Sequence, residues 1–61
     1  MADKLLTSEE VAALLGFKVK TIHNWASLGR IPHLKIGGRL RFNATVLNEW
    51  MKQFVEPEIG T

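Results

Sequence analysis

The chain has 61 residues, of which 46% are hydrophobic and 23% are charged, and its formal net charge is +2. This composition is typical of one small globular domain and excludes an intrinsically disordered chain. Because the sequence contains no cysteine, a disulfide framework and a thiolate metal site are both excluded.

The first predicted element is a short helix that begins near Ser8. Thr7 and Glu10 have the spacing of a capping box, in which each side chain accepts a hydrogen bond from the other residue's backbone N–H. Apolar residues follow at helical spacing, and Gly16 suits the left-handed conformation that ends many helices. We therefore expect a helix of about two turns that stops at Gly16.

A second helix is predicted to begin close to Lys18 and to end at Gly29. Its apolar face comprises Val19, Ile22, Trp25 and Ala26. Only a tight turn that contains glycine separates the two helices, and this arrangement is typical of a helix-turn-helix. Many helical hairpins without a DNA function share the pattern, so it does not identify a function by itself.

The next segment is predicted to form a β-hairpin. Apolar residues alternate there with basic ones around a Gly-Gly pair: Leu34, Ile36, Leu40 and Phe42 with Lys35, Arg39 and Arg41 around Gly37 and Gly38. From this alternation we expect one apolar face and one basic face. The glycines supply the positive φ values of the tip and allow it to approach a backbone closely. A basic hairpin beside a helix-turn-helix is a wing.

A third helix is predicted from Ala44 to Phe54, with Asn43 as its N-cap. Trp25 and Trp50 each lie on the apolar face of a predicted helix, so we interpret them as core residues rather than platforms for stacking bases. Pro57 and the residues after it suggest a short tail. We therefore expect a single domain over residues 1–61, with its core in 5–54 and a tail at 55–61.

The charges are distributed unevenly along the chain. There is no Asp or Glu between Val11 and Asn48. All the cations except Lys4 and Lys52 lie in that segment: Lys18, Lys20, Arg30, Lys35, Arg39 and Arg41. Such a cationic surface favours a polyanionic partner, because neutralised phosphates release their counterions. The alternative is a solvated basic face that maintains solubility.

The sequence offers little support for a membrane protein or an enzyme. No apolar run approaches the roughly 20 residues of a membrane span, and the N-terminus lacks a signal peptide, so we expect a cytoplasmic protein. His23 and His33 have no cysteine and no nearby acid to complete a metal site. With no pairing of nucleophile and base, no phosphate loop and no cofactor motif, we predict a non-enzymatic protein without cofactors.

The order and spacing of the segments resemble the excisionase family of DNA-binding domains, which is related to the MerR N-terminal domain. The matching segments are LLTSEEVA (residues 5–12), LLG (14–16), TI (21–22), GRIP (29–32), KIG (35–37), RLRF (39–42) and, in the third predicted helix, Leu47 with EWM (49–51). This resemblance implies a fold that is mainly α with a small β-hairpin, a winged helix-turn-helix. It also implies that the second helix enters the major groove and that the wing lies along phosphates or in the minor groove.

The sequence departs from the family pattern at two positions. Lys18 stands where relatives often have a capping Ser or Thr, and Val19 stands where they are often basic or polar. The first change should weaken the cap by about 0.5–2 kcal/mol. The second prevents transfer of a relative's target sequence. The dimerising coiled coil and effector domain of a complete MerR-type regulator are missing, so sensing of a small molecule or metal is not expected.

If Ile22, Trp25 and Ala26 face inward, the second helix turns a largely polar surface outward. The candidates for contacting base edges are Val19, Lys20, His23, Asn24 and Ser27. An asparagine can pair with adenine, a lysine can donate to guanine, and valine methyls can pack on thymine. Asn24 is open to base or phosphate contact, whereas phosphate is favoured for Lys20.

Further candidates for DNA contact are predicted mainly around the phosphates. They are Lys18, Thr21, Arg30, Lys35, Gly37, Gly38, Arg39 and Arg41. Arg39 at the hairpin tip is placed for the minor groove, whereas Lys35 and Arg41 are assigned to the backbone. Arg30 either reaches a phosphate or interacts with the carboxyl end of the second helix. For Thr7 and Ser8, capping is favoured over phosphate binding.

Sequence-specific binding of double-stranded DNA is the leading functional prediction. The resemblance implies a transcriptional regulator or a recombination directionality factor from a prokaryote, a phage or another mobile element. The expected partners are DNA, further copies of the chain on repeated sites, and a recombinase or the transcription machinery. The alternatives are a protein-interaction module that docks a partner near Trp50, Met51 and Phe54, and, less favoured, RNA binding.

Overall fold

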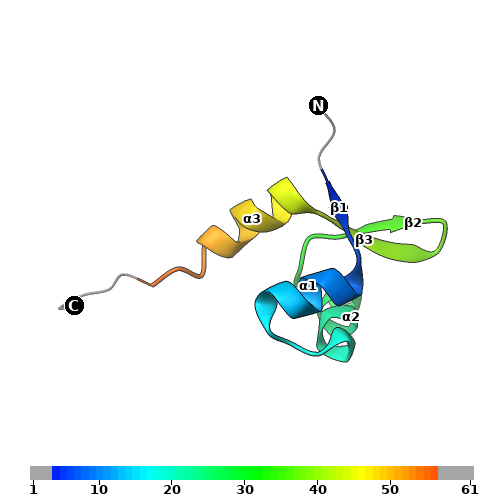
Figure 1. Ribbon diagram of the computed structural model, residues 1–61, viewed down its shortest axis with the longest axis horizontal. Coiled ribbons are helices and arrows are strands. Elements are labelled where there is room, and N and C mark those ends of the chain that lie inside the picture. The colour runs from blue at the N-terminus through cyan, green and yellow to red at the C-terminus, as the bar shows by residue number, and fades with distance from the viewer. Residues whose placement is uncertain (1–3, 57–61) are drawn as a thin grey trace.

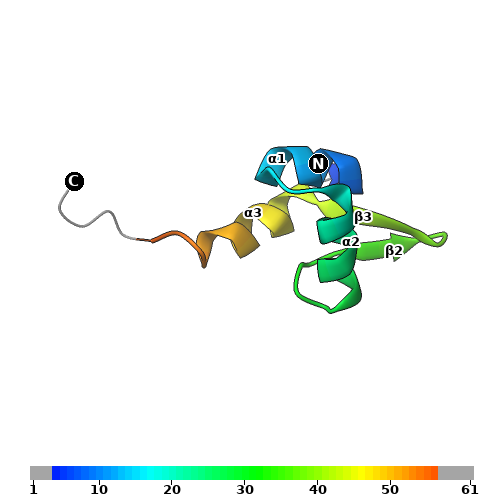
Figure 2. The ribbon, with the colours of Figure 1, turned by 90° about the horizontal axis from the view of Figure 1, so that it is seen from below.

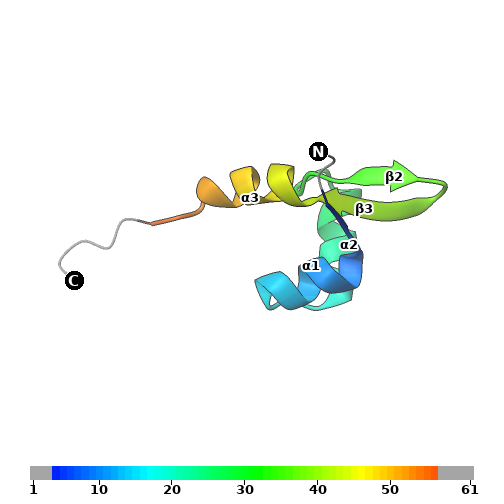
Figure 3. The same ribbon diagram turned by 45° about the horizontal axis from the view of Figure 1, so that its top comes forward.

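A computed structural model of the chain describes residues 4–56. The elements are β1 (Leu5–Leu6), α1 (Ser8–Leu15), α2 (Val19–Ser27), β2 (Leu34–Ile36), β3 (Arg39–Asn43) and α3 (Ala44–Lys52). Helices α1 and α2 lie on one side of a small sheet, and α3 leads away from β3 in the direction opposite to the β2–β3 hairpin (Figures 1 and 3). This architecture of helices around a small antiparallel sheet confirms the expected fold.

The capping box at the start of α1 is confirmed. The Glu10 backbone N–H donates to Thr7 Oγ1 at 3.1 Å, and the Thr7 backbone N–H donates to Glu10 Oε1 at 2.8 Å. At the other end, Gly16 adopts φ 78° and its N–H donates to the Ala12 carbonyl at 2.9 Å. Each end of this helix is therefore set by residues within four positions of it.

Helix α2 begins without a side-chain cap. Its N-cap residue is Lys18, which makes no capping hydrogen bond from its side chain, as the departure from the family pattern predicts. The helix ends where expected, because Gly29 adopts φ 70° and the Arg30 N–H donates back to the Trp25 carbonyl at 2.8 Å. The turn between α1 and α2 spans only residues 16–18, which brings the two helices into the compact helix-turn-helix arrangement.

The sheet has the strand order β1-β3-β2, and both pairings are antiparallel. In the first pairing, Leu5 lies opposite Asn43 and Leu6 lies opposite Phe42. The sequence pattern does not predict β1, because a strand of two residues is too short to show alternation. This strand ties the start of the chain to the centre of the sheet.

The register of the hairpin differs from the prediction of one apolar and one basic face. Ile36 lies opposite Arg39, Lys35 opposite Leu40, and Leu34 opposite Arg41. Opposite residues of an antiparallel pair share a face of the sheet, so each face combines aliphatic and basic residues. Positive φ values at Gly37 (58°) and Gly38 (80°) close the hairpin with a two-residue turn, and this turn fixes the observed pairing.

Helix α3 begins as predicted and ends slightly earlier. Asn43 Oδ1 accepts a hydrogen bond from the Val46 N–H at 3.0 Å, which confirms Asn43 as the N-cap. The helix ends at Lys52 rather than Phe54, because the following N–H groups bond three residues back in a tighter turn. Of the predicted tail, 57–61 lies outside the described residues.

The core lies between α1, α2, β3 and the start of α3. Its fully buried large side chains are Phe42, Ile22, Ile31, Leu47 and Val11. Trp25 and Trp50 pack against this cluster, as predicted, but each remains half-buried. Within residues 4–56, no helix combines the length and hydropathy needed to cross a membrane.

Candidate nucleic-acid interface

The solvent-facing side of α2 lies opposite the buried side chains of Ile22 and Ala26. Its exposed members are the predicted base-contacting residues Lys20, His23, Asn24 and Ser27. Thr21 is half-buried and, together with Lys20, His23 and Asn24, borders a shallow hollow. The helix therefore presents both hydrogen-bond donors and acceptors to solvent.

Val19 is the exception among the predicted base-contacting residues. Its side chain is half-buried and packs against the core, so only part of it faces outward. The same residue completes the apolar face of α2 that the helical periodicity indicated. Packing thus restricts the contact that we expected Val19 to make with DNA.

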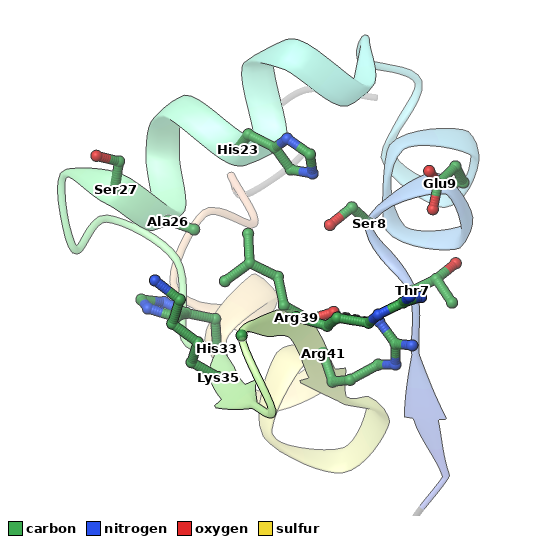
Figure 4. Close-up of a pocket in the computed structure, with 12 residues that line it drawn as sticks. Thr7, Ser8, Glu9, His23, Ala26, Ser27, His33, Lys35, Arg39 and Arg41 are labelled. Carbon is green, nitrogen blue, oxygen red and sulfur yellow. Dashed lines mark hydrogen bonds between the residues drawn. The ribbon is translucent and has the colours of Figure 1, made fainter.

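A concave surface, which we call the basic cleft, lies between α2, the hairpin and the start of α1 (Figure 4). Figure 2 shows the ribbon of α2 next to that of the β2–β3 hairpin. Its lining residues are Thr7, Ser8, Glu9, His23, Ala26, Ser27, His33, Lys35, Gly38, Arg39, Leu40 and Arg41. The cleft brings together predicted site residues from the second helix and from the wing. These residues are distant in sequence, and the fold of α2 against the sheet places them on one surface.

The cleft is cationic and has little internal charge compensation. Lys35 and Arg39 are exposed, and the ion pair between Lys52 and Glu49 on α3 is the only one within residues 4–56. Arg41 Nη1 donates to the Leu40 carbonyl at 2.7 Å, which holds its guanidinium beside the strand (Figure 4). Glu9 is the only carboxylate among the lining residues. An anion at the hairpin side would therefore meet unpaired positive charge.

Glu10 lies close to this charge but has a structural role. The hydrogen bond from the Thr7 backbone N–H lowers the pKa of Glu10, and the positive charges of Lys4 and Arg41 lower it further. The carboxylate is thereby kept ionised as the acceptor of the capping box. For Thr7, the structure shows the capping role favoured by the sequence.

His33 also lines the cleft, although it is not among the residues predicted to contact DNA. Its Nδ1 donates to the Ile31 carbonyl at 2.8 Å, which fixes the ring and leaves Nε2 directed elsewhere. The sequence does contain a signal that could have placed His33 in the cleft. His33 stands two residues before Lys35, and alternate residues of an extended chain share a face. Within the described part of the chain, His, Cys, Asp and Glu form no group of three suited to a metal ion.

Arg30 and Lys18 do not line the basic cleft. Arg30 instead borders a separate depression that we call the aromatic groove, with Phe17, Trp25, Trp50, Phe54, Val55, Leu15 and Met51. Lys18 is exposed at the N-terminus of α2. The structure therefore places Arg30 away from the wing cations, although a phosphate contact was one of the two roles predicted for it.

The chain was compared with known protein families. A family model described as a helix-turn-helix domain matches residues 5–54, which span every helix and strand of the fold. No curated protein and no solved structure matches the chain.

Proposed function

The chain belongs to the helix-turn-helix domain family and is a DNA-binding domain, and from this premise we propose that it recognises a specific sequence in double-stranded DNA. In this proposal α2 enters the major groove and the β2–β3 hairpin acts as the wing. The observation that supports it is the basic cleft, where the polar side of α2 and the wing cations share one surface. The bound protein acts through occupancy of its site and not through catalysis.

The concave shape of the basic cleft suits the path of a DNA backbone. A duplex whose major groove holds α2 has a phosphate strand between that groove and the adjacent minor groove. We place this strand in the cleft, where Lys35 and Arg41 neutralise phosphates. Arg39, at the tip of the hairpin, then reaches the minor groove, whose negative potential favours arginine.

Sequence recognition is assigned to the exposed residues of α2. Asn24 is exposed and has the donor and acceptor pair that fits an adenine edge. Lys20 lies one turn earlier and is assigned to phosphate, and His23 and Ser27 face the cleft. Gly37 and Gly38 allow the hairpin backbone to approach the sugar-phosphate strand, because neither has a side chain there.

We further propose that the biological role is transcriptional regulation or the direction of DNA recombination. Either role needs stable occupancy of particular sites, whereas one small module buries only about 600–1,000 Å² on DNA. Several copies are therefore required on neighbouring or inverted sites. The expected additional partner is a recombinase or the transcription machinery, and the setting is the cytoplasm of a prokaryote.

The test is a salt titration of binding to a duplex selected from a random library. Because several wing and helix cations contact phosphate, we expect log–log slopes of about −3 to −5 per module. Lys20→Ala should reduce the slope by about one. Lys52→Ala is the matched control, because Lys52 lies on α3 and pairs with Glu49 at 3.0 Å. A slope near zero, or equal losses in both variants, would contradict the proposal.

A further inference from the structure

Two aromatic pairs from different parts of the chain line the aromatic groove. Phe17 contacts Trp25 edge to face, with ring centroids 4.8 Å apart. Trp50 and Phe54 form a similar pair, with ring centroids 4.9 Å apart. The other lining residues are apolar except Arg30, which is the only charged residue among them.

The residues at the edge of this groove are unusually exposed for their type. Phe17 is 49% accessible, Phe54 is 61% and Val55 is 74%. Single exposed apolar side chains are common on protein surfaces, but a contiguous set marks an interaction site. A partner that covers these apolar side chains removes their surface from water, and this removal favours binding.

Two opposite charges at this end of the molecule lack partners in the described part of the chain. Arg30 forms no ion pair within residues 4–56, and neither does Glu56. Glu56 directly follows Val55, which itself lines the groove. Residues 54–56 therefore combine exposed apolar side chains with the acidic Glu56. The groove combines an apolar lining with the basic Arg30.

We propose that a second copy of this chain occupies the aromatic groove. The end of α3 and residues 54–56 of one copy lie in the groove of the other, and the exchange is reciprocal. Phe54 and Val55 of one copy contact the aromatic residues in the groove of the other, and Glu56 pairs with Arg30 across the interface. One patch thus serves as both groove and occupant, which is the self-complementarity that a twofold dimer requires.

The shape of the fold permits this pairing. Helix α3 projects from the rest of the domain, so its end is accessible to another molecule (Figures 1 and 3). The groove and the basic cleft share no lining residue, so the dimer leaves both clefts open. If the proposed DNA function holds, a twofold dimer presents two recognition helices and prefers inverted half-sites.

Sedimentation equilibrium of the full chain without DNA tests the pairing. We expect a reversible dimer whose dissociation constant rises at least tenfold in Phe54→Ser, a loss of about 1.4 kcal/mol. Val46→Ser is the matched control, because Val46 is an exposed α3 residue (48% accessible) that does not line the groove. Circular dichroism checks that each variant is folded.

A charge exchange tests the orientation of the two copies. Arg30→Glu and Glu56→Lys should each weaken the dimer, and the double variant should restore it. A chain that remains monomeric up to about 1 mM, or a Phe54→Ser variant that dimerises like the wild type, would overturn the proposal. Failure of the double variant to recover would also overturn it.

The outcomes for the dimer and for DNA binding are distinguishable. Phe54→Ser should bind a single half-site with unchanged affinity and an unchanged salt slope, and lose affinity only for the inverted pair. A monomer with the expected salt slope contradicts the dimer alone. A dimer whose DNA binding does not respond to salt contradicts the proposed function alone.

Discussion

The basic cleft and the aromatic groove differ in chemistry, although α2 contributes to both. Asn24 and Trp25 are adjacent in sequence, but the first faces solvent beside the cleft and the second lines the groove. Ile22 and Ala26 face the core between them. A helix of nine residues thus serves three environments, because successive side chains differ by about 100° in direction. Substitutions along α2 should therefore separate into those that affect its solvent-facing side, those that affect the aromatic groove and those that affect the core.

The largest expected effect is a loss of stability that disrupts the basic cleft and the aromatic groove together. Phe42 is fully buried between the helices and the sheet, and the cleft and groove both depend on that packing. Phe42→Ala should lower the free energy of unfolding by about 3–5 kcal/mol, a large part of the stability of a small domain. Urea unfolding followed by circular dichroism measures this loss. Normal stability in this variant would show that the two regions do not share one core.

A smaller effect should be confined to DNA recognition by the solvent-facing side of α2, beside the basic cleft. Asn24→Ala should cost about 1–3 kcal/mol on the preferred duplex and relax the preference at one base pair. Its stability should be unchanged, because Asn24 is exposed. Binding to a library of single base-pair variants measures both quantities, with Lys20→Ala as the comparison that should weaken all sites alike. An even loss at every position for Asn24→Ala would assign that residue to the backbone.

The wing should contribute affinity with less sequence preference. Arg39→Ala should weaken binding to most duplexes and reduce the salt slope by about one. The fold should remain intact, because Arg39 is exposed and flanks the turn of the hairpin. A quantitative mobility-shift assay with circular dichroism tests this expectation. Unchanged affinity in a folded variant would remove the wing from the interface.

The smallest expected effect is a pH dependence of stability that belongs to neither region. The folded pKa of Glu10 lies below its usual range, because the Thr7 backbone N–H donates to the carboxylate. The stabilisation is therefore present above the unfolded pKa of a glutamate and is lost as the pH falls through the lower, folded pKa. Glu10→Gln should lower Tm slightly at neutral pH and converge with the wild type in acid. A difference that persists in acid would contradict this origin.

Features set by neighbouring residues were predictable from the sequence. The capping box of Thr7 and Glu10, the left-handed Gly16 and the Asn43 cap each depend on residues within four positions. Features set by distant contacts were not. Burial of Ile31, the position of Arg30 beside Trp25 and the pairing of β1 all depend on how the elements pack. The existence of the wing was predictable, but the distribution of its side chains between the two faces was not.

The turn at Gly37 and Gly38 has a further consequence for the folding landscape. If β2 slipped by one residue, Ile36 would face Leu40 and Leu34 would face Phe42, which would sort the hairpin into an apolar and a basic face. The apolar pattern therefore favours one register, whereas the glycines, with φ values of 58° and 80°, favour another. This local conflict is a form of frustration that the two-residue turn resolves. Residues with no charge thus decide which β2 side chains share a face of the wing with Arg39 and Arg41.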